Sequence, residues 1–114
     1  MDVRFTYVVQ TNQSKGKHMT DRELLELAAK ACGLEEAKMR IEFNQWNPLD
    51  DDGDALRLAV KLGLFIQINS GSATAWKWRG ENWYEQASDN ADDMSAATRR
   101  AITRAAAEIG RNMK

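Results

Sequence analysis

Three segments of the chain carry apolar residues at the 3.6-residue spacing of an α-helix. We expect the first helix over residues 21–32, a second that opens within Asp50–Asp54 and ends at Gly63, and a third over residues 95–112. Thr20 and Glu23 have the spacing of a capping box, and Gly33 and Gly63 stand where the first two helices need a positive φ. The predicted buried stripes are Leu24, Leu27, Ala28 and Ala31, then Ala55, Leu58, Ala59 and Leu62 widened by Leu56 and Val60, then Ala97, Ala101, Ile102, Ala105 and Ile109.

Other segments have the two-residue alternation or the apolar runs that are typical of strands. Residues 39–43 alternate apolar and charged side chains, and residues 64–68 are apolar on both faces, which predicts a central strand. Residues 73–79 alternate again after the turn Asn69–Ser72, and residues 83–85 are expected to form a further short strand. We expect residues 86–93, which are polar and acidic, to form a loop before the last helix.

The beginning of the chain differs from the rest. Residues 3–10 are rich in β-branched and aromatic types, whereas residues 11–18 are polar, so residues 1–18 are interpreted as an N-terminal extension that is either an edge strand or flexible. Residues 19–114 are expected to form a single α+β domain that folds without this extension. Its order is (β)-α-β-α-β-β-α, a small antiparallel or mixed β-sheet of three to four strands packed with three α-helices.

Composition excludes several classes of protein. The 114 residues contain 16 Lys and Arg against 17 Asp and Glu, so a wholly basic nucleic-acid coat protein is not expected. One Cys cannot form an internal disulfide, and one His cannot build a histidine-rich metal site. Neither a membrane-spanning apolar run nor a basic-then-apolar leader is visible, so we expect a cytoplasmic protein with no membrane partner.

No set of residues predicts catalysis, a cofactor or a metal site, and we therefore expect a non-enzymatic protein. Phosphate-binding glycine loops are missing from the sequence, and Cys32 has no histidine nearby. The run Asp50, Asp51, Asp52 and Asp54 has a calcium-loop appearance around Gly53. That loop would need ligands at Pro48 and Ala59, so the run is better explained as an N-cap and first turn of a helix.

Two groups of residues are candidates for binding. The first group combines aromatic and cationic side chains: Trp76, Trp78, Arg79, Trp83 and Tyr84. Trp76 and Trp78 share one face of their strand, and three interpretations stay open for them: the core, a protein interface, or a platform on which bases stack. The second group is the basic face of the last helix, with Arg99, Arg100 and Arg104. Ion pairs with acidic neighbours explain this face most simply, and phosphate contacts are the alternative.

Three blocks of sequence carry a family resemblance. They are residues 19–31, residues 46–62 (WNPLDDDGDALRLAVKL), and residues 96–111. Together they resemble a family of short phage and prophage proteins of Gram-negative bacteria with no established activity, and more loosely the phage ABA-sandwich domain group. Members of that family begin near the position of Met19.

The resemblance implies a phage accessory protein that acts in the bacterial host cell. We expect it to bind a host protein or complex, with an inhibitor of bacterial immunity as the most concrete form. The alternative is a protein that sequesters a nucleotide or nucleic acid through Trp stacking and Arg–phosphate contacts. Whether it forms a homodimer is left open at this stage.

Overall fold

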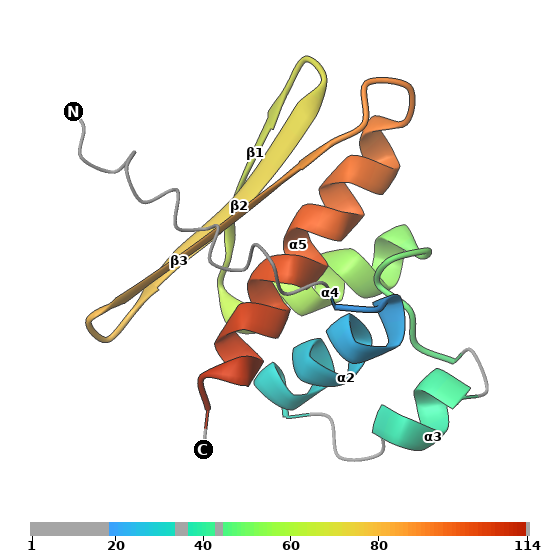
Figure 1. Cartoon of the computed structure of the whole chain (residues 1–114), viewed down its shortest axis with the longest axis vertical. Coiled ribbons are helices and arrows are strands. Elements are labelled where there is room, and N and C mark those ends of the chain that lie inside the picture. Colours follow the sequence, from blue (N-terminus) through green and yellow to red (C-terminus); the bar gives the residue numbers. More distant parts are fainter. Residues whose placement is uncertain (1–18, 34–36, 43–44, 114) are drawn as a thin grey trace.

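The computed structural model describes residues 19–33, 37–42 and 45–113, and these form an α+β fold (Figure 1). The predictions for residues 1–18 lie outside the described residues. In chain order the elements are α2 (Asp21–Ala31), α3 (Ala37–Glu42), α4 (Asp52–Leu62), β1 (Phe65–Asn69), β2 (Ser72–Arg79), β3 (Asn82–Asp89) and α5 (Met94–Arg111).

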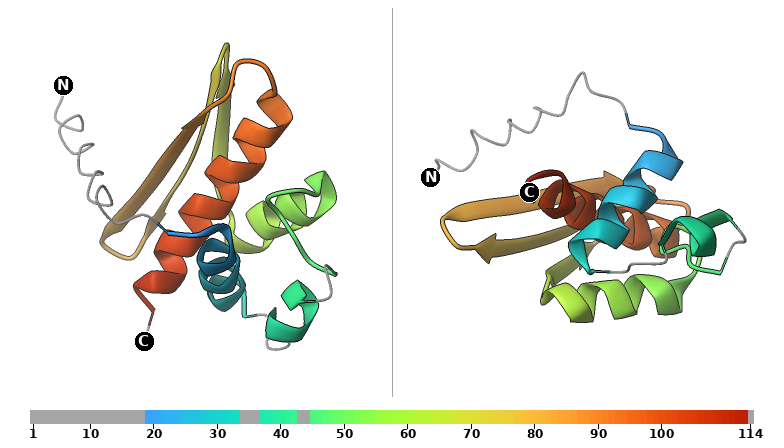
Figure 2. Two further views of the ribbon diagram at one scale, coloured as in Figure 1. Left: turned by 45° about the vertical axis from the view of Figure 1, so that its right-hand side comes forward. Right: turned by 90° about the horizontal axis from the view of Figure 1, so that it is seen from below.

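The three strands form an antiparallel meander in the order β1-β2-β3. Two-residue turns join them, Ser70–Gly71 and Gly80–Glu81, and the glycines have φ of 90° and 63°. Such turns require positive φ, which glycine adopts without a steric penalty. One face of the sheet is covered by α5, and α2 and α4 pack on α5 from the other side (Figure 2).

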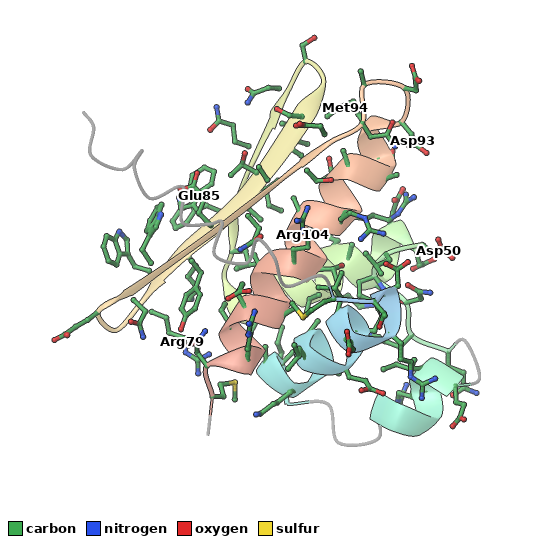
Figure 3. The ribbon with its side chains drawn as sticks, in the orientation of Figure 1. Asp50, Arg79, Glu85, Asp93, Met94 and Arg104 are labelled. Carbon is green, nitrogen blue, oxygen red and sulfur yellow. The ribbon has the colours of Figure 1, made fainter. Side chains whose placement is uncertain are left out.

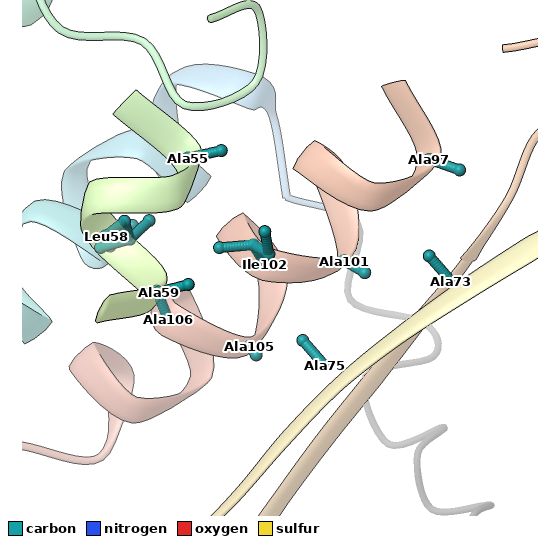
Figure 4. Packing of buried hydrophobic residues seen from close by; sticks show 11 residues of the cluster. Ala55, Leu58, Ala59, Ala73, Ala75, Ala97, Ala101, Ile102, Ala105 and Ala106 are labelled. Carbon is teal, nitrogen blue, oxygen red and sulfur yellow. The ribbon is translucent and has the colours of Figure 1, made fainter. Parts of the chain in front are cut away.

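Helix α5 is the centre of the core because it has neighbours on two sides. Figure 4 shows Ala97, Ala101 and Ala105 directed towards the sheet, and Ile102 directed towards α4. The strand residues opposite them are also small and fully buried, namely Ala73 and Ala75. Alanine on both sides lets the helix backbone come close to the strand, so this core depends on close approach more than on large side chains.

The ends of the helices agree with the sequence. Thr20 and Glu23 form the expected capping box at the start of α2. Asp51 caps α4, because its carboxylate accepts a hydrogen bond from the backbone N–H of Asp54 at 2.8 Å. Gly63 ends α4 with φ 69° in the left-handed region. These predictions are confirmed. They could be made from the sequence because capping depends on residues that are close together in the chain.

Three predictions about strands were wrong. Residues 39–42 of the segment expected as a strand lie in helix α3, whose Ile41 packs on Leu25 and Leu49 in a separate small cluster. Five alternating residues also fit a short helix, and the packing of α3 on α2 decides between the two. The apolar strand expected at the centre, β1, is an edge strand, and β2 is central. Strand β3 continues to Asp89, into the segment expected as a loop.

Helix α4 buries a narrower stripe than the sequence predicts. Ala55, Leu58 and Ala59 are buried as expected. Leu56 and Val60, which were expected to widen the stripe, are 60% and 71% exposed. They are exposed because α4 contacts the rest of the core along one side only, through α5. An apolar strip on the outside of α4 is therefore left uncovered by the described residues.

Candidate functional site

The sheet has a second face that no helix of the described part of the chain covers (Figures 1 and 2). Because Ala73 and Ala75 point towards α5, the alternate residues of β2 point the other way. The strand register extends this assignment to the neighbouring strands. The side chains on the helix-free face are Phe65, Gln67, Asn69, Ser72, Thr74, Trp76, Trp78, Trp83, Glu85, Ala87 and Asp89.

Four large aromatic side chains gather on this surface, and we call them the aromatic face: Phe65, Trp76, Trp78 and Trp83. Phe65 and Trp76 are cross-strand partners whose rings stack with centroids 5.7 Å apart and an interplanar angle of 14°. Trp78 and Trp83 are the next cross-strand pair, with centroids 5.0 Å apart and planes tilted by 56°. Trp78 is 62% exposed, Phe65 60% and Trp83 37%. The indole N–H of Trp83 donates to Oε1 of Glu85 at 3.0 Å, which holds that ring in place.

Of the three interpretations left open for Trp76 and Trp78, the one that places them in the core is wrong, because both lie on the helix-free face. The strand alternation was identified correctly, but the side of the sheet that receives the helix was not. Ala73 and Ala75 take the helix side because α5 packs closely there, and a tryptophan would not fit between the two backbones. The signal was present in the sequence: β2 alternates alanine with larger residues, and α5 is rich in alanine.

The structure divides the first predicted binding group between the two sides of the sheet. Tyr84 is buried on the helix side, opposite Lys77, so it does not belong to the exposed surface. Nζ of Lys77 donates to the backbone carbonyl of Leu62 at 2.6 Å. Arg79 is exposed but also points to the helix side of β2, at the far end of the hairpin. Trp76, Trp78 and Trp83 are brought together, and the cations expected to accompany them are not.

The arginines of α5 are used within the molecule. Arg99 is largely buried, and its guanidinium donates to the carbonyl of Leu49 at 2.8 Å and to Asp52 at 2.6 Å. Arg100 forms an ion pair with Asp21 at 3.1 Å. These contacts tie α5 to the start of α4 and to the start of α2. The interpretation of this basic face as a set of ion pairs with acidic neighbours is confirmed for both residues.

Arg104 lies between α5 and the sheet rather than on an open surface. Its guanidinium donates to the backbone carbonyl of Ala87 in β3 at 3.2 Å. Burial, followed by repulsion from Arg100, lowers the pKa of Arg104, and Glu108 opposes this shift. In Figure 3, Arg104 lies on α5, while Glu85 lies on the side of the sheet away from that helix. The two predicted binding groups therefore do not form one site.

The acidic run at the start of α4 has structural tasks. Asp51 is the N-cap, and Asp54 accepts hydrogen bonds from the backbone of Asn47 at 2.9 Å and from Arg57 at 2.7 Å. Asp52 is held by Arg99. Within the described ranges, no group of three His, Cys, Asp or Glu residues could hold a metal ion.

The helix-free face differs in charge from the rest of the molecule. Its described positions include two carboxylates, Glu85 and Asp89, and no Lys or Arg. The remaining polar positions are neutral. The surface thus combines an exposed aromatic centre with a weakly acidic border.

Among helices 21–31, 37–42, 52–62 and 94–111, none is long and apolar enough to cross a membrane.

Comparisons of the chain with protein-family models, curated proteins and solved structures give no match.

Proposed function

We propose that this protein is a non-enzymatic binding module that docks on a partner protein through its aromatic face. The observation that carries the proposal is the position of Phe65, Trp78 and Trp83, which are large, more than a third exposed and gathered with Trp76 on one face of the sheet. Exposed aromatic clusters of this kind are rare on monomeric proteins and are enriched at the centres of protein interfaces.

The charges on the same surface support a protein partner over a nucleic acid. Binding of phosphate needs cations close to the stacking residues. The described positions around the aromatic face carry Glu85 and Asp89 instead, which would repel a phosphate backbone. Arg99, Arg100 and Arg104, which the nucleic-acid alternative requires, lie on α5 and bind protein atoms.

The chemistry of the surface also favours a particular kind of partner. Indole faces attract the ammonium and guanidinium groups of Lys and Arg through their π-electrons. Glu85 lies beside the indole of Trp83 and would pair with such a cation. The preferred partner therefore presents an apolar centre bordered by Lys or Arg side chains.

The family resemblance supplies the setting for this proposal. It implies a phage accessory protein in a bacterial cell, so the partner would be a host protein or complex. Inhibition of a bacterial immune complex is the most concrete form, since a small protein without a catalytic set can act by occupying a surface. This part of the proposal rests on analogy with similar phage proteins.

Two neighbouring residues on opposite sides of β2 provide a matched test. Trp78→Ser removes the most exposed tryptophan of the aromatic face, and Arg79→Ser removes a cation from the other side of the sheet. The tagged protein and both variants are used to capture proteins from a Gram-negative bacterial extract. A protein retained by the parent is then purified, and its affinity is measured with pure components at several salt concentrations.

A protein partner on the aromatic face should lose affinity about tenfold or more with Trp78→Ser, since central tryptophans contribute about 2 kcal/mol or more. Arg79→Ser should have no comparable effect. Titration with single-stranded DNA and with nucleotides, followed by tryptophan fluorescence, should show no binding. Nucleic-acid binding that weakens steeply with salt and depends on Arg79 would contradict the proposal and support the alternative.

A further inference from the structure

The two edges of the sheet are not protected to the same degree. At the β3 edge, Glu85 and Asp89 place charges along the strand, and Arg104 binds the outward carbonyl of Ala87. Charged side chains and covered backbone groups are the usual means by which proteins keep sheet edges from pairing. The β1 edge has the sequence Phe-Ile-Gln-Ile-Asn, with no charge and no proline, and no described strand pairs with its outer side.

The turn fixes which backbone groups of β1 point outward. Asn69 and Ser72 close the two-residue turn, and hydrogen-bonded pairs alternate with non-bonded pairs from there. Phe65, Gln67 and Asn69 therefore bond to β2. The N–H and C=O groups of Ile66 and Ile68 point away from the sheet, ready to pair with another strand.

The side chains next to this edge are apolar. Ile68 is 60% exposed on the helix side of the sheet, and Leu56 of the uncovered strip of α4 lines a common groove with it. An open groove of about 370 Å³ separates α4 from β1, and its lining includes Leu56, Ile66, Ile68 and Met94. Four of the six large hydrophobic side chains that are exposed in the described part of the chain belong to α4 and β1: Leu56 and Val60 on the helix, and Ile68 and Phe65 on the strand, with Phe65 on the helix-free face.

We propose that the β1 edge is a self-association surface on which a second copy of this chain pairs its own β1 in antiparallel orientation. The twofold axis passes beside Gln67, so that Ile66 of one copy is hydrogen-bonded opposite Ile68 of the other, and the reverse. The two sheets become one continuous sheet. The isoleucines of both copies are covered by the apolar strips of the two α4 helices.

A second copy fits this surface better than an unrelated strand for two reasons. An antiparallel pair of strands has the same hydrogen-bonding pattern when read from either side, so an edge strand is complementary to itself about a twofold axis. The described surface is also uncharged along β1, so two copies bring no like charges together there. The strand has only 5 residues, and α4 is needed to extend the contact towards the roughly 800 Å² per partner of a stable interface.

Self-association at this edge goes beyond the proposed function and does not depend on it. The helix-free faces of the two copies would lie on the same side of the joined sheet, with Phe65 of each copy near the axis. The dimer would then present two aromatic faces side by side and could hold a repetitive or symmetric partner with increased avidity.

The first test measures the mass of the full chain in solution by sedimentation equilibrium between low and high micromolar concentrations. The parent protein should be a dimer. Ile68→Lys places an ammonium group between the two α4 helices and should weaken the dimer about tenfold or more, while circular dichroism confirms that the variant is folded. Ala87→Lys makes the same type of change at the protected edge and should leave the dimer intact. A monomeric parent, or a dimer insensitive to Ile68→Lys, would overturn the proposal.

The second test concerns the register. In the background Cys32→Ser, Gln67→Cys places one thiol from each copy beside the axis, where directly opposed non-bonded residues have Cα atoms about 4.5 Å apart. Mild oxidation should give a disulfide-linked dimer rapidly, and Ala87→Cys treated in the same way should not. Absence of the cross-link in Gln67→Cys would refute this pairing. Trp78→Ser should leave both tests unchanged, so failure of the binding proposal and failure of the dimer are distinguishable.

Discussion

The close contact between α5 and α2 gives a prediction whose sign depends on tertiary structure. Gly110 is buried within α5 where this helix crosses α2. A Cβ atom built at this position would overlap the backbone carbonyl oxygen of Leu27, and would lie 2.9 Å from its carbonyl carbon and 3.3 Å from the backbone nitrogen of Ala31. These neighbours are backbone atoms, so they cannot rotate away. Gly110→Ala therefore requires α2 to move as a unit.

Two opposing contributions set the size of the effect. Replacing a glycine inside a helix by alanine stabilises the helix by about 1 kcal/mol. Forcing an extra methyl group into a packed contact costs about 1–3 kcal/mol, and contact with backbone places this case near the upper end. The expected result is a net loss of about 1–2 kcal/mol in the free energy of unfolding. At roughly 4 °C per kcal/mol for a domain of this size, Tm should fall by about 4–8 °C.

Urea unfolding followed by tryptophan fluorescence and by far-UV circular dichroism measures the loss. Gly53→Ala is the matched control, because it makes the same substitution in the first turn of α4. Its added methyl group would lie 3.2 Å from a guanidinium nitrogen of Arg57 and from Oδ2 of Asp51, and a shift of a few tenths of an ångström in these side chains relieves both contacts. We expect the control to change stability by less than about 1 kcal/mol. An unchanged or higher Tm for Gly110→Ala would refute the close helix contact.

Three further predictions test other parts of the structure. Arg99→Ala should lower the free energy of unfolding by about 2 kcal/mol, because it leaves the Leu49 carbonyl without its charged donor. Arg100→Ala removes an exposed ion pair and should cost less than about 1 kcal/mol, and thermal unfolding of the two variants compares them. Asp51→Ala removes the N-cap of α4 and should lower the free energy of unfolding, measured in urea, by about 1 kcal/mol. Asp50→Ala removes the neighbouring carboxylate and serves as the control that leaves this cap in place. Ala75→Asp buries an unpaired carboxylate against α5 and should prevent folding at neutral pH, and a soluble variant with native circular dichroism would contradict the assignment of the buried sheet face.

Much of the local structure could be predicted because its causes are local. The capping box at Thr20, the Asp51 cap and the turn at Gly63 each depend on a few neighbouring residues. The long stripe of α5 and the alternation in β2 identified those elements correctly. The interpretation of the α5 arginines as ion-paired residues is confirmed for Arg99 and Arg100, but their partners Asp52 and Asp21 lie 47 and 79 positions away, and the fold brings them together.

The candidate surface could not be predicted in the same way. Alternation placed Trp76 and Trp78 together on one side of β2, but gave no information on which side α5 would cover. That choice depends on contacts between residues more than twenty positions apart, such as Ala75 with Ala101 and Ala105. The number of strands beside β1 is likewise a property of the whole sheet, so an apolar strand that looked central became an exposed edge.

From the sequence alone, the α+β class, three of the helices, the caps of the first two, and the alternation that separates tryptophans from cations on β2 could be predicted. Tertiary structure alone decided that 37–42 is a helix, that the tryptophans face away from α5, and that Leu56 and Val60 remain uncovered. The physical reason is that periodicity fixes the relative directions of side chains within one element. Which face is buried depends on the size and shape of the element that packs against it, and here the small side chains of α5 selected the alanine face of the sheet.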